Sequence, residues 1–205
     1  MIDWMVLLAF VPAGLALNLT PGADMMFCLG QGLRSGPWPA VSASAGISVG
    51  AFVHAFAAGL GLSALVAAFP LAFDVIRWIG VGYLLWLAWQ SLKAGPVGGK
   101  VKGVSVSKAF RQGLLVNLTN PKVILFVLAF VPQFVDPARP VLPQFLIYGA
   151  VLALGGFVIN GLVGVFAGGI GKRLAQDAGF ATWLGRISAG IFVALAARLA
   201  LMQRG

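Results

Sequence analysis

Residues 18–24, Asn18-Leu19-Thr20-Pro21-Gly22-Ala23-Asp24, form a polar stretch inside an apolar run that extends from Trp4 to Leu33. Residues 117–122, Asn117-Leu118-Thr119-Asn120-Pro121-Lys122, repeat the Asn-Leu-Thr triplet and place a proline one position later, again inside an apolar run. Proline lacks the backbone N–H that a helix interior needs. Each stretch therefore predicts a break in an otherwise continuous apolar helix.

The composition indicates an integral membrane protein, embedded in lipid. Of the 205 residues, 60% are hydrophobic and only 9% are charged, whereas roughly 25% are charged in an ordinary globular domain. The net charge of +9 comes from basic residues that lie mostly between apolar segments, which indicates membrane topology and argues against a nucleic-acid partner. The single cysteine, Cys28, allows no intrachain disulfide and no cysteine zinc site, and we expect no cofactor.

Six apolar segments are long enough to cross a bilayer, which takes about 20 residues of helix. They cover roughly residues 4–33, 39–68, 71–93, 109–135, 142–171 and 180–202. The two breaks fall in the first and fourth segments, so we expect these two helices to be broken. A stretch rich in Gly, Lys and Ser, at about 94–108, is typical of a solvated linker.

We therefore expect one all-α, polytopic transmembrane domain over residues 1–205, with a first repeat at about 4–93 and a second at about 109–203. Three segments in each half is an odd number, so the second half would be an inverted copy of the first. The Gly46-x-x-x-Gly50 pattern in the second segment has a counterpart, Gly164-x-x-x-Gly168, in the fifth. Such patterns allow close helix packing within a chain or in a homodimer. Inverted repeats are common in secondary transporters.

Lysine and arginine concentrate in alternate loops, and cytoplasmic loops of membrane proteins carry an excess of both. This distribution predicts that both termini are periplasmic. The basic residues that follow the first segment, surround the linker and follow the fifth segment are Arg34, Lys93, Lys100, Lys102, Lys108, Arg111, Lys172 and Arg173.

Each break predicts a helix N-terminus at membrane depth. Thr20 and Asn120 directly precede the prolines and are good N-cap types, while Pro21 and Pro121 suit the first helical position. Exposed N–H groups at such an end attract anions, and transporters use them to hold a substrate carboxylate. Gly22 would let a ligand approach the backbone. Alternatively, each break is a kink whose carbonyls are satisfied by neighbouring Thr and Asn side chains.

The ionisable residues nearest to the breaks are Asp24 and Lys122. Charge at membrane depth is costly, so such residues are functional candidates by default. Our hypothesis is that Asp24 binds a substrate ammonium or carries a coupling proton, while Lys122 faces a carboxylate or Asp24. The alternatives are a static salt bridge or a lysine that reaches the membrane interface.

Three further polar residues complete the candidate substrate or coupling site and its surroundings. Asn117 lies in the second break. His54, the only histidine, continues the ridge of Gly46 and Gly50, and it is either a proton relay or an interhelical hydrogen-bonding group. Asn160 is likewise an interhelical hydrogen-bonding group or a cavity-lining residue.

These features resemble the LysE/RhtB family of amino-acid exporters. The resemblance extends over about residues 4 to 200 and includes Phe110-Arg111-Gln112-Gly113 and Phe130-Val131-Pro132-Gln133-Phe134. It implies an efflux transporter of the bacterial cytoplasmic (inner) membrane that exports basic or neutral amino acids such as lysine, homoserine, threonine or leucine by proton antiport. The family often has a second proline where this chain has Ala23, which leaves the substrate subgroup open. The family's motif positions fall on Pro21, Gly22, Asp24, Asn120, Pro121 and Lys122.

Other classes of membrane protein fit the sequence less well. A thiol-disulfide electron carrier would need paired cysteines, and a metal exporter would need several intramembrane carboxylates or histidines. No nucleotide-binding loop of the GxxxxGK type occurs, and no enzymatic activity is expected. An exporter of another small solute, a channel or a structural membrane protein remain as alternatives.

Overall fold

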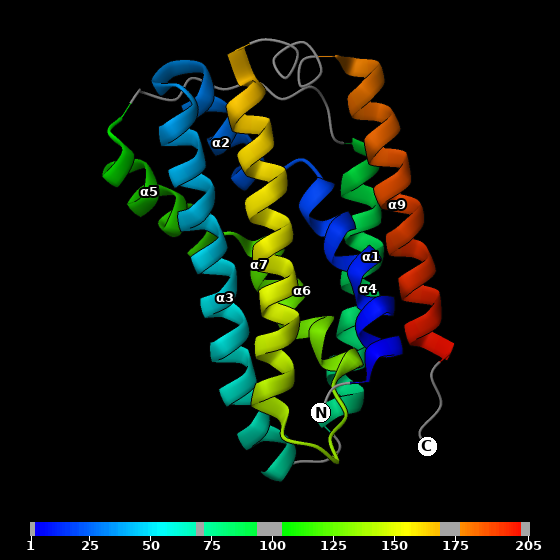
Figure 1. The fold of residues 1–205 in the computed structure, drawn as a ribbon. Coiled ribbons are helices and arrows are strands. Elements are labelled where there is room, and N and C mark those ends of the chain that lie inside the picture. Colours follow the sequence, from blue (N-terminus) through cyan, green and yellow to red (C-terminus); the bar gives the residue numbers. More distant parts are fainter. Residues whose placement is uncertain (1–2, 69–71, 94–103, 169–176, 202–205) are drawn as a thin grey trace.

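The computed structural model describes residues 3–68, 72–93, 104–168 and 177–201, and all regular structure in these residues is helical (Figure 1). The central part of the expected linker, together with Lys100, Lys102, Lys172 and Arg173, lies outside the described residues. The helices fall on the predicted apolar segments. They are α1 (Trp4–Leu19), α2 (Ala23–Ser35), α3 (Pro37–Ala68), α4 (Ala72–Lys93), α5 (Val106–Leu118), α6 (Pro121–Ala129), the 3-10 helix η1 (Val131–Phe134), α7 (Val141–Val165), the 3-10 helix η2 (Phe166–Gly168) and α9 (Ala178–Leu201).

The predicted breaks are present in the first and fourth apolar segments. The axes of α1 and α2 differ by 55°, and those of α5 and the α6–η1 segment differ by 53°. Among the described residues, α3 and α7 are each long and apolar enough to cross a membrane, and each bent pair passes the same test, which gives two to four candidate spans. The arrangement of six spans as an inverted repeat stays a prediction.

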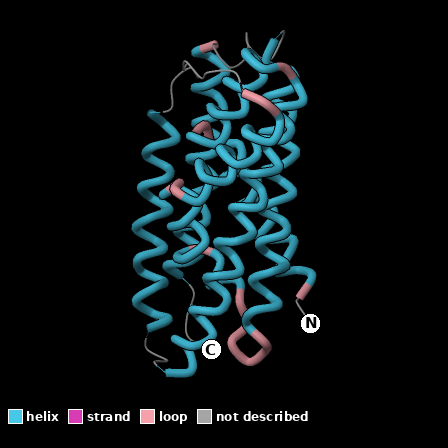
Figure 2. The backbone as a smooth tube through the Cα atoms, turned by 90° about the vertical axis from the view of Figure 1, so that its left-hand side faces the viewer, coloured by secondary structure: helices cyan, strands magenta, loops and turns pink. Residues whose placement is uncertain are grey.

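The helices form an elongated bundle in which α3 packs against α5 and α7, and α4 packs against α9 (Figures 1 and 2). Two halves of the broken helices, α1 and α6, run through the middle: α1 contacts α7 and α9, and α6 contacts α4. The chain reverses direction between successive segments, so α1 begins and α9 ends at the same end of the bundle (Figure 1). Both breaks therefore lie inside the bundle, between its two pairs of long helices.

The linker is shorter than predicted, because α5 begins at Val106 and not at residue 109. Ser105 has extended backbone angles at the N-cap position, and the N–H of Ala109 donates to its carbonyl at 2.8 Å. Ala109 is fully buried in a small cluster with Cys28, Ala43 and Ile47. Tertiary packing of this first turn thus extends the helix into sequence whose composition favours a linker.

The predicted ridge of small residues on α3 faces α5. A Cβ atom added to Gly46 would overlap the carbonyl oxygen of Phe110, and one added to Gly50 would lie 2.7 Å from Oδ1 of Asn117. The two glycines therefore allow α3 to lie directly against the helix that carries the second break.

Replacing Gly46 with alanine should destabilise the protein, because the added methyl group has no room between α3 and α5. We expect a loss of about 1–3 kcal/mol, typical of overpacking, measurable as a lower melting temperature in detergent. Gly82→Ala is the matched control, since a Cβ on this glycine of α4 would meet nothing within 4 Å. Helix propensity favours alanine there by about 1 kcal/mol. Equal melting temperatures of the two variants would contradict the packing argument.

An aromatic cluster joins α1, α6, η1 and α7 on the side of the breaks where α1 begins. Its rings are buried and their centroids are 4.7 to 6.5 Å apart, a usual range for stabilising aromatic pairs. The cluster closes the bundle between the breaks and that end of the molecule. Its members are Phe10, Phe126, Phe130, Phe134 and Tyr148.

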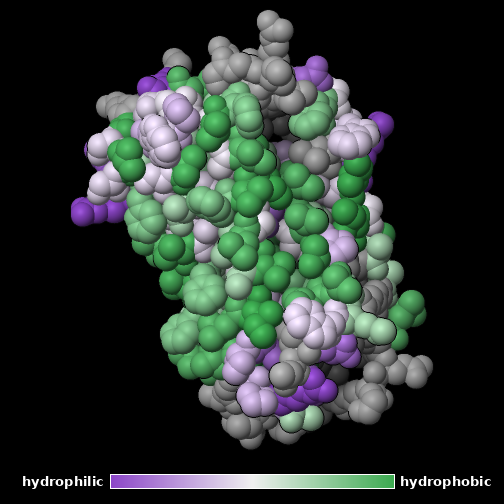
Figure 3. All heavy atoms as spheres, in the orientation of Figure 1, coloured by the Kyte–Doolittle hydropathy of each residue, from purple (hydrophilic) through white to green (hydrophobic). Residues whose placement is uncertain are grey.

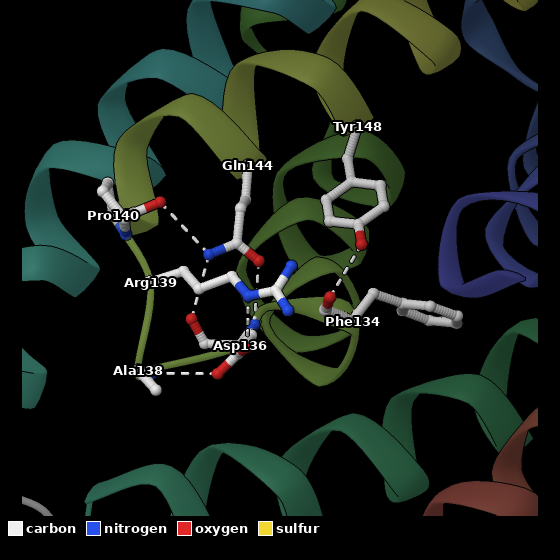
Figure 4. A network of polar contacts seen from close by, with 7 residues as sticks. All are labelled: Phe134, Asp136, Ala138, Arg139, Pro140, Gln144 and Tyr148. Atoms are coloured by element: carbon white, nitrogen blue, oxygen red, sulfur yellow. Dashed lines mark hydrogen bonds and ion pairs between the residues drawn. The ribbon is translucent and has the colours of Figure 1, made fainter. Parts of the chain in front are cut away.

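Hydrogen bonds fix the turn between η1 and α7 beside this cluster (Figure 4). The hydroxyl of Tyr148 donates to the carbonyl of Phe134 at 2.7 Å. The amide of Gln144 donates to the carbonyls of Asp136 and Pro140, at 2.9 and 3.1 Å, and accepts from the N–H of Asp136 at 2.9 Å. The turn is thereby held rigidly against the start of α7.

The outer surface suits a lipid environment. Hydrophobic side chains cover the middle of the face in Figure 3, and hydrophilic ones gather toward its two ends. Water would disfavour so large an exposed apolar area, whereas the bilayer core accepts it. Exposed apolar side chains occur on α1, α3, α4, α7 and α9, among them Leu8, Val53, Leu85, Leu154 and Val193.

Candidate functional site

The second break has the predicted geometry. Helix α6 begins at Pro121, and Oδ1 of Asn120 accepts a hydrogen bond from the N–H of Lys122 at 3.0 Å. Proline fits the first helical position because the N–H that it lacks would be unpaired there. Asn120 is therefore the N-cap of a helix that starts inside the bundle.

The first break differs from the prediction. Thr20 does not cap α2: it ends α1, and its hydroxyl donates back to the carbonyl of Ala16 at 2.6 Å. The proline also does not restart the helix, since α2 begins at Ala23 with Gly22 as its N-cap. A threonine hydroxyl can bond forward as a cap or back to the preceding turn. Here the backward bond forms, and residues 20–22 connect the two helices, with extended backbone angles at Thr20 and Gly22.

Lys122 connects the two breaks. Its ammonium donates to the carbonyls of Leu17 and Thr20, at 3.0 and 2.9 Å, in the last turn of α1. These carbonyls have no partner within a helix and lie at its negative end. The ammonium thus points at the first break and not at the membrane interface. Gly22 makes room for it, because a Cβ there would lie 3.2 Å from Nζ.

Asp24 is held from the opposite side. Its side chain is 7% exposed, and Oδ2 accepts a hydrogen bond from Nδ2 of Asn117 at 3.0 Å. The carbonyl of Asn117 lies 3.2 Å from Nε2 of His54 on α3. His54 therefore has the geometry of an interhelical hydrogen bond. Each break thus supplies a polar side chain that holds the other: Lys122 holds the end of α1, and Asn117 holds Asp24.

A small cavity lies where the two breaks meet. Its free volume is about 10 Å³, roughly the space needed by one water molecule. A ligand as large as an amino acid would have to move the surrounding helices to enter, so this is a closed form of the cavity. The lining residues are Leu17, Asn18, Thr20, Asp24, Met25, Lys122, Val123 and Asn160.

Several polar atoms around this cavity have no hydrogen-bond partner among the described residues. Leaving such an atom unsatisfied costs about 1–3 kcal/mol, and the exceptions in native proteins call for an explanation such as a functional role or a bound molecule. The Nζ of Lys122 also has a third N–H beyond the two that its carbonyl partners accept. The unpartnered atoms are Oδ1 of Asp24, Oδ1 of Asn117, Nδ2 of Asn120 and Oδ1 of Asn160.

The structure brings most of the predicted site residues together. Thr20, Asp24 and Lys122 line the cavity. Asn117 contacts Asp24, and Gly22 lies beside Lys122. His54 and Asn120 do not line the cavity but contact Asn117 and Lys122, respectively, and the two prolines are not among the lining residues. Asn160, from α7, lines the cavity as well.

Sequence reasoning missed Asn18 and Tyr83. Asn18 lines the cavity and donates to the carbonyl of Leu152 at 3.2 Å. Its equivalence to Asn117 in the shared Asn-Leu-Thr triplet is a signal that could have identified it. The Tyr83 hydroxyl donates to the carbonyl of Lys122 at 2.7 Å, and nothing in the sequence around Tyr83 indicates this contact.

Comparison with known proteins gives a family. A family model described as LysE type translocator matches residues 15–203. The chain is 34% identical over 144 residues to a homoserine/homoserine lactone efflux protein of Salmonella typhimurium, covering 69% of this chain and 70% of the relative. It is 32% identical over 203 residues to a leucine efflux protein of Enterobacter sp., covering 95% and 94%.

A third relative is an uncharacterized membrane protein of Vibrio cholerae, 38% identical over 150 residues that cover 72% of this chain and 73% of the relative. No solved structure gives a significant match. The family match extends over both breaks, the cavity and nearly all the rest of the sequence. The chain therefore belongs to the family of LysE type translocators.

Proposed function

We propose that this chain exports an amino acid across the bacterial cytoplasmic membrane in exchange for protons. The observation that carries the proposal is that Asp24 and Lys122 line the same cavity, at the meeting point of the two helix breaks. An amino acid carries one ammonium and one carboxylate, and the cavity offers one group for each. Two of the relatives are named as efflux proteins, for homoserine and for leucine.

Each charged residue has hydrogen-bonding capacity left for a ligand. Oδ1 of Asp24 is buried without a partner among the described residues and would accept from the substrate ammonium. The third N–H of Lys122 would donate to the substrate carboxylate. Hydrogen bonds between charged groups are about twice as strong as neutral ones. The cavity would therefore select the α-ammonium and α-carboxylate that all amino acids share.

Proton antiport would follow from competition at Asp24. Oδ1 of Asp24 would bind either the substrate ammonium or a proton, because both need the same lone pairs of the carboxylate. A carrier that returns empty would leave an unpaired charge at membrane depth, which is costly. Protonation of Asp24 would remove that charge on the return step, so one export step would be linked to proton entry.

Alternating access would use the two breaks as hinges. The expected inverted repeat is supported by a chain that runs in opposite directions at the two breaks and by their similar bends. The basic residues Arg34, Lys93 and Lys108 lie at the ends of α2 and α4 and the start of α5, opposite the end where α1 begins. We assign the basic end to the cytoplasm and both termini to the periplasm.

A flux screen tests the proposal. Purified protein in lipid vesicles, with an imposed pH gradient, should drive uphill movement of at least one labelled amino acid, and collapsing the gradient should stop it. Movement of no amino acid, under conditions where the protein remains folded, would contradict the export function. Movement that ignores the pH gradient would contradict only proton antiport.

Replacing Asn117 with alanine should lower kcat/KM for export by about 10- to 100-fold, since a hydrogen bond to a charged group contributes about 1.5–3 kcal/mol and about 1.4 kcal/mol corresponds to tenfold. The variant removes the hydrogen bond that orients Asp24. Thr119→Ala is the matched control in the same break, because among the described residues the Thr119 hydroxyl bonds to carbonyls of its own helix, those of Leu115 and Val116. Vesicle flux that is equally reduced in both variants would show that Asn117 acts only through the general structure of the break.

A further inference from the structure

Asn160 differs from the other polar residues of the cavity because it comes from α7, outside both breaks. It lies in an apolar helix of 25 residues, is 3% exposed, and its Oδ1 atom has no hydrogen-bond partner among the described residues. An amide in this position is costly unless something satisfies it, since neither hydrocarbon nor apolar side chains can do so. A bound molecule in the cavity is the candidate partner.

Resting on the proposed function, we propose that Asn160 determines substrate specificity by hydrogen-bonding a polar group on the side chain of a neutral amino acid. Asp24 and Lys122 would be occupied by the ammonium and carboxylate common to all amino acids. Discrimination then depends on the rest of the lining. Its apolar members, Leu17, Met25 and Val123, offer at most the weak acceptor of the Met25 thioether. The hydroxyl of Thr20 already donates to the carbonyl of Ala16.

The other uncharged amide of the lining is already engaged. Nδ2 of Asn18 donates to the carbonyl of Leu152, and its side chain lies against two glycines of α7. A Cβ on Gly156 would be 3.2 Å from Oδ1 of Asn18 and 3.9 Å from Nδ2 of Asn160. Gly156, one turn before Asn160, therefore keeps open the space between the two amides. A substrate side chain entering there would meet Asn160.

The charges of the cavity indicate a neutral side chain. Asp24 is the single carboxylate among the described lining residues, and Lys122 already brings one ammonium. A basic amino acid would add a further cation with no second acidic group to pair with it, which is unfavourable at low dielectric. A hydroxyl or an amide on the substrate would instead supply the donor that Oδ1 of Asn160 lacks.

Two pairs of nearly isosteric substrates test this role in vesicles: homoserine against norvaline, and threonine against valine. Each pair exchanges a hydroxyl for a methyl group. We expect the wild-type protein to favour the hydroxyl member about tenfold in kcat/KM, a typical effect of one hydrogen bond. Asn160→Leu should bring this ratio close to one while norvaline or valine is still transported. Asn160→Ala, measured in parallel, covers the case in which leucine does not fit.

Asn18→Leu is the matched control. It removes the amide already bound to α7 and should lower export of both members of a pair equally, without changing their ratio. A wild type with no hydroxyl preference, or a preference that survives in both Asn160 variants, overturns the inference while leaving amino-acid export intact. Export of no amino acid by the wild type would instead contradict the proposed function. If the role of Asn160 is purely structural, both Asn160 variants should lower the melting temperature and leave the kcat/KM ratio of the two substrates unchanged.

Discussion

Asp24→Asn should abolish pH-driven export, with a decrease of about 100-fold or more in uphill flux. Losing a hydrogen bond to a charged group costs up to about 3 kcal/mol, and about 1.4 kcal/mol corresponds to tenfold. Asparagine has nearly the same shape as aspartate, and its carbonyl oxygen can still accept from Nδ2 of Asn117. The fold and the closed cavity should therefore persist, while the group that would bind an ammonium or a proton is lost.

Two flux measurements separate the possible roles of Asp24. If Asp24 binds the substrate ammonium, both uphill export and the exchange of labelled for unlabelled substrate should fail. If Asp24 only carries the coupling proton, exchange should continue and uphill export alone should stop. Wild-type uphill rates at normal protein abundance would remove Asp24 from the site.

Asp136→Asn serves as the matched control for this experiment. Asp136 lies in the turn before α7 and pairs with Arg139 at 2.9 Å, with both side chains nearly half exposed. Exposed ion pairs of this kind contribute about 0–1 kcal/mol, so this variant should export normally. Its failure would indicate that loss of any acidic residue impairs the protein, and would leave no specific role for the buried carboxylate.

The sequence predicts the positions of both breaks because their cause is local. Proline removes a helical N–H, but Pro12 lies inside α1 without ending it, so the signal is a proline next to polar residues. At the second break, the side-chain oxygen of Asn120 can accept from an N–H in the first turn of α6. Thr20 is different, because its hydroxyl has two local options of similar strength. The backward bond to Ala16 forms together with the extended backbone angles of Thr20 and Gly22, and no local sequence pattern specifies this combination.

The partners of the charged residues could not be predicted because they depend on the distance between the breaks. Asp24 and Lys122 are separated by about a hundred residues, and the sequence suggests only that opposite charges could meet. In the folded chain Lys122 is bound to main-chain carbonyls and Asp24 to an amide. Carbonyls are present at every residue, so sequence carries no signal for such a contact. Packing of α6 against the end of α1 creates it.

Removing the ammonium of Lys122 should weaken both substrate binding and the closed structure of the site. In Lys122→Ala, the carbonyls of Leu17 and Thr20 lose their partner, at a cost of about 1–3 kcal/mol for each unsatisfied group. The proposed contact with the substrate carboxylate disappears as well. We expect KM to rise at least about tenfold, since that contact is charge-assisted, together with a lower melting temperature.

Lys122→Arg and Lys122→Met divide this effect into charge and shape. Arginine keeps a permanent charge and several donors. Its larger head has little room beside Gly22, because a Cβ atom added to this glycine would lie only 3.2 Å from Nζ of Lys122. Methionine keeps the length of the side chain and removes the charge. The expected order of substrate affinity is therefore wild type, then Arg, then Met and Ala together. Initial rates over a range of substrate concentrations in vesicles give this order.

The exposed Lys108 provides the control, since Lys108→Ala removes a positive charge from the first turn of α5, at the opposite end of this helix from the break, and should leave KM unchanged. Full activity of both the Arg and Ala variants of Lys122 would mean that this ammonium is dispensable for binding. A loss of stability with unchanged KM would mean that it serves only to tie α6 to the end of α1. Arginine can also donate to the carbonyls of Leu17 and Thr20. A rise in KM that arginine partly reverses therefore supports a contact with the substrate only if the arginine and methionine variants have equal melting temperatures.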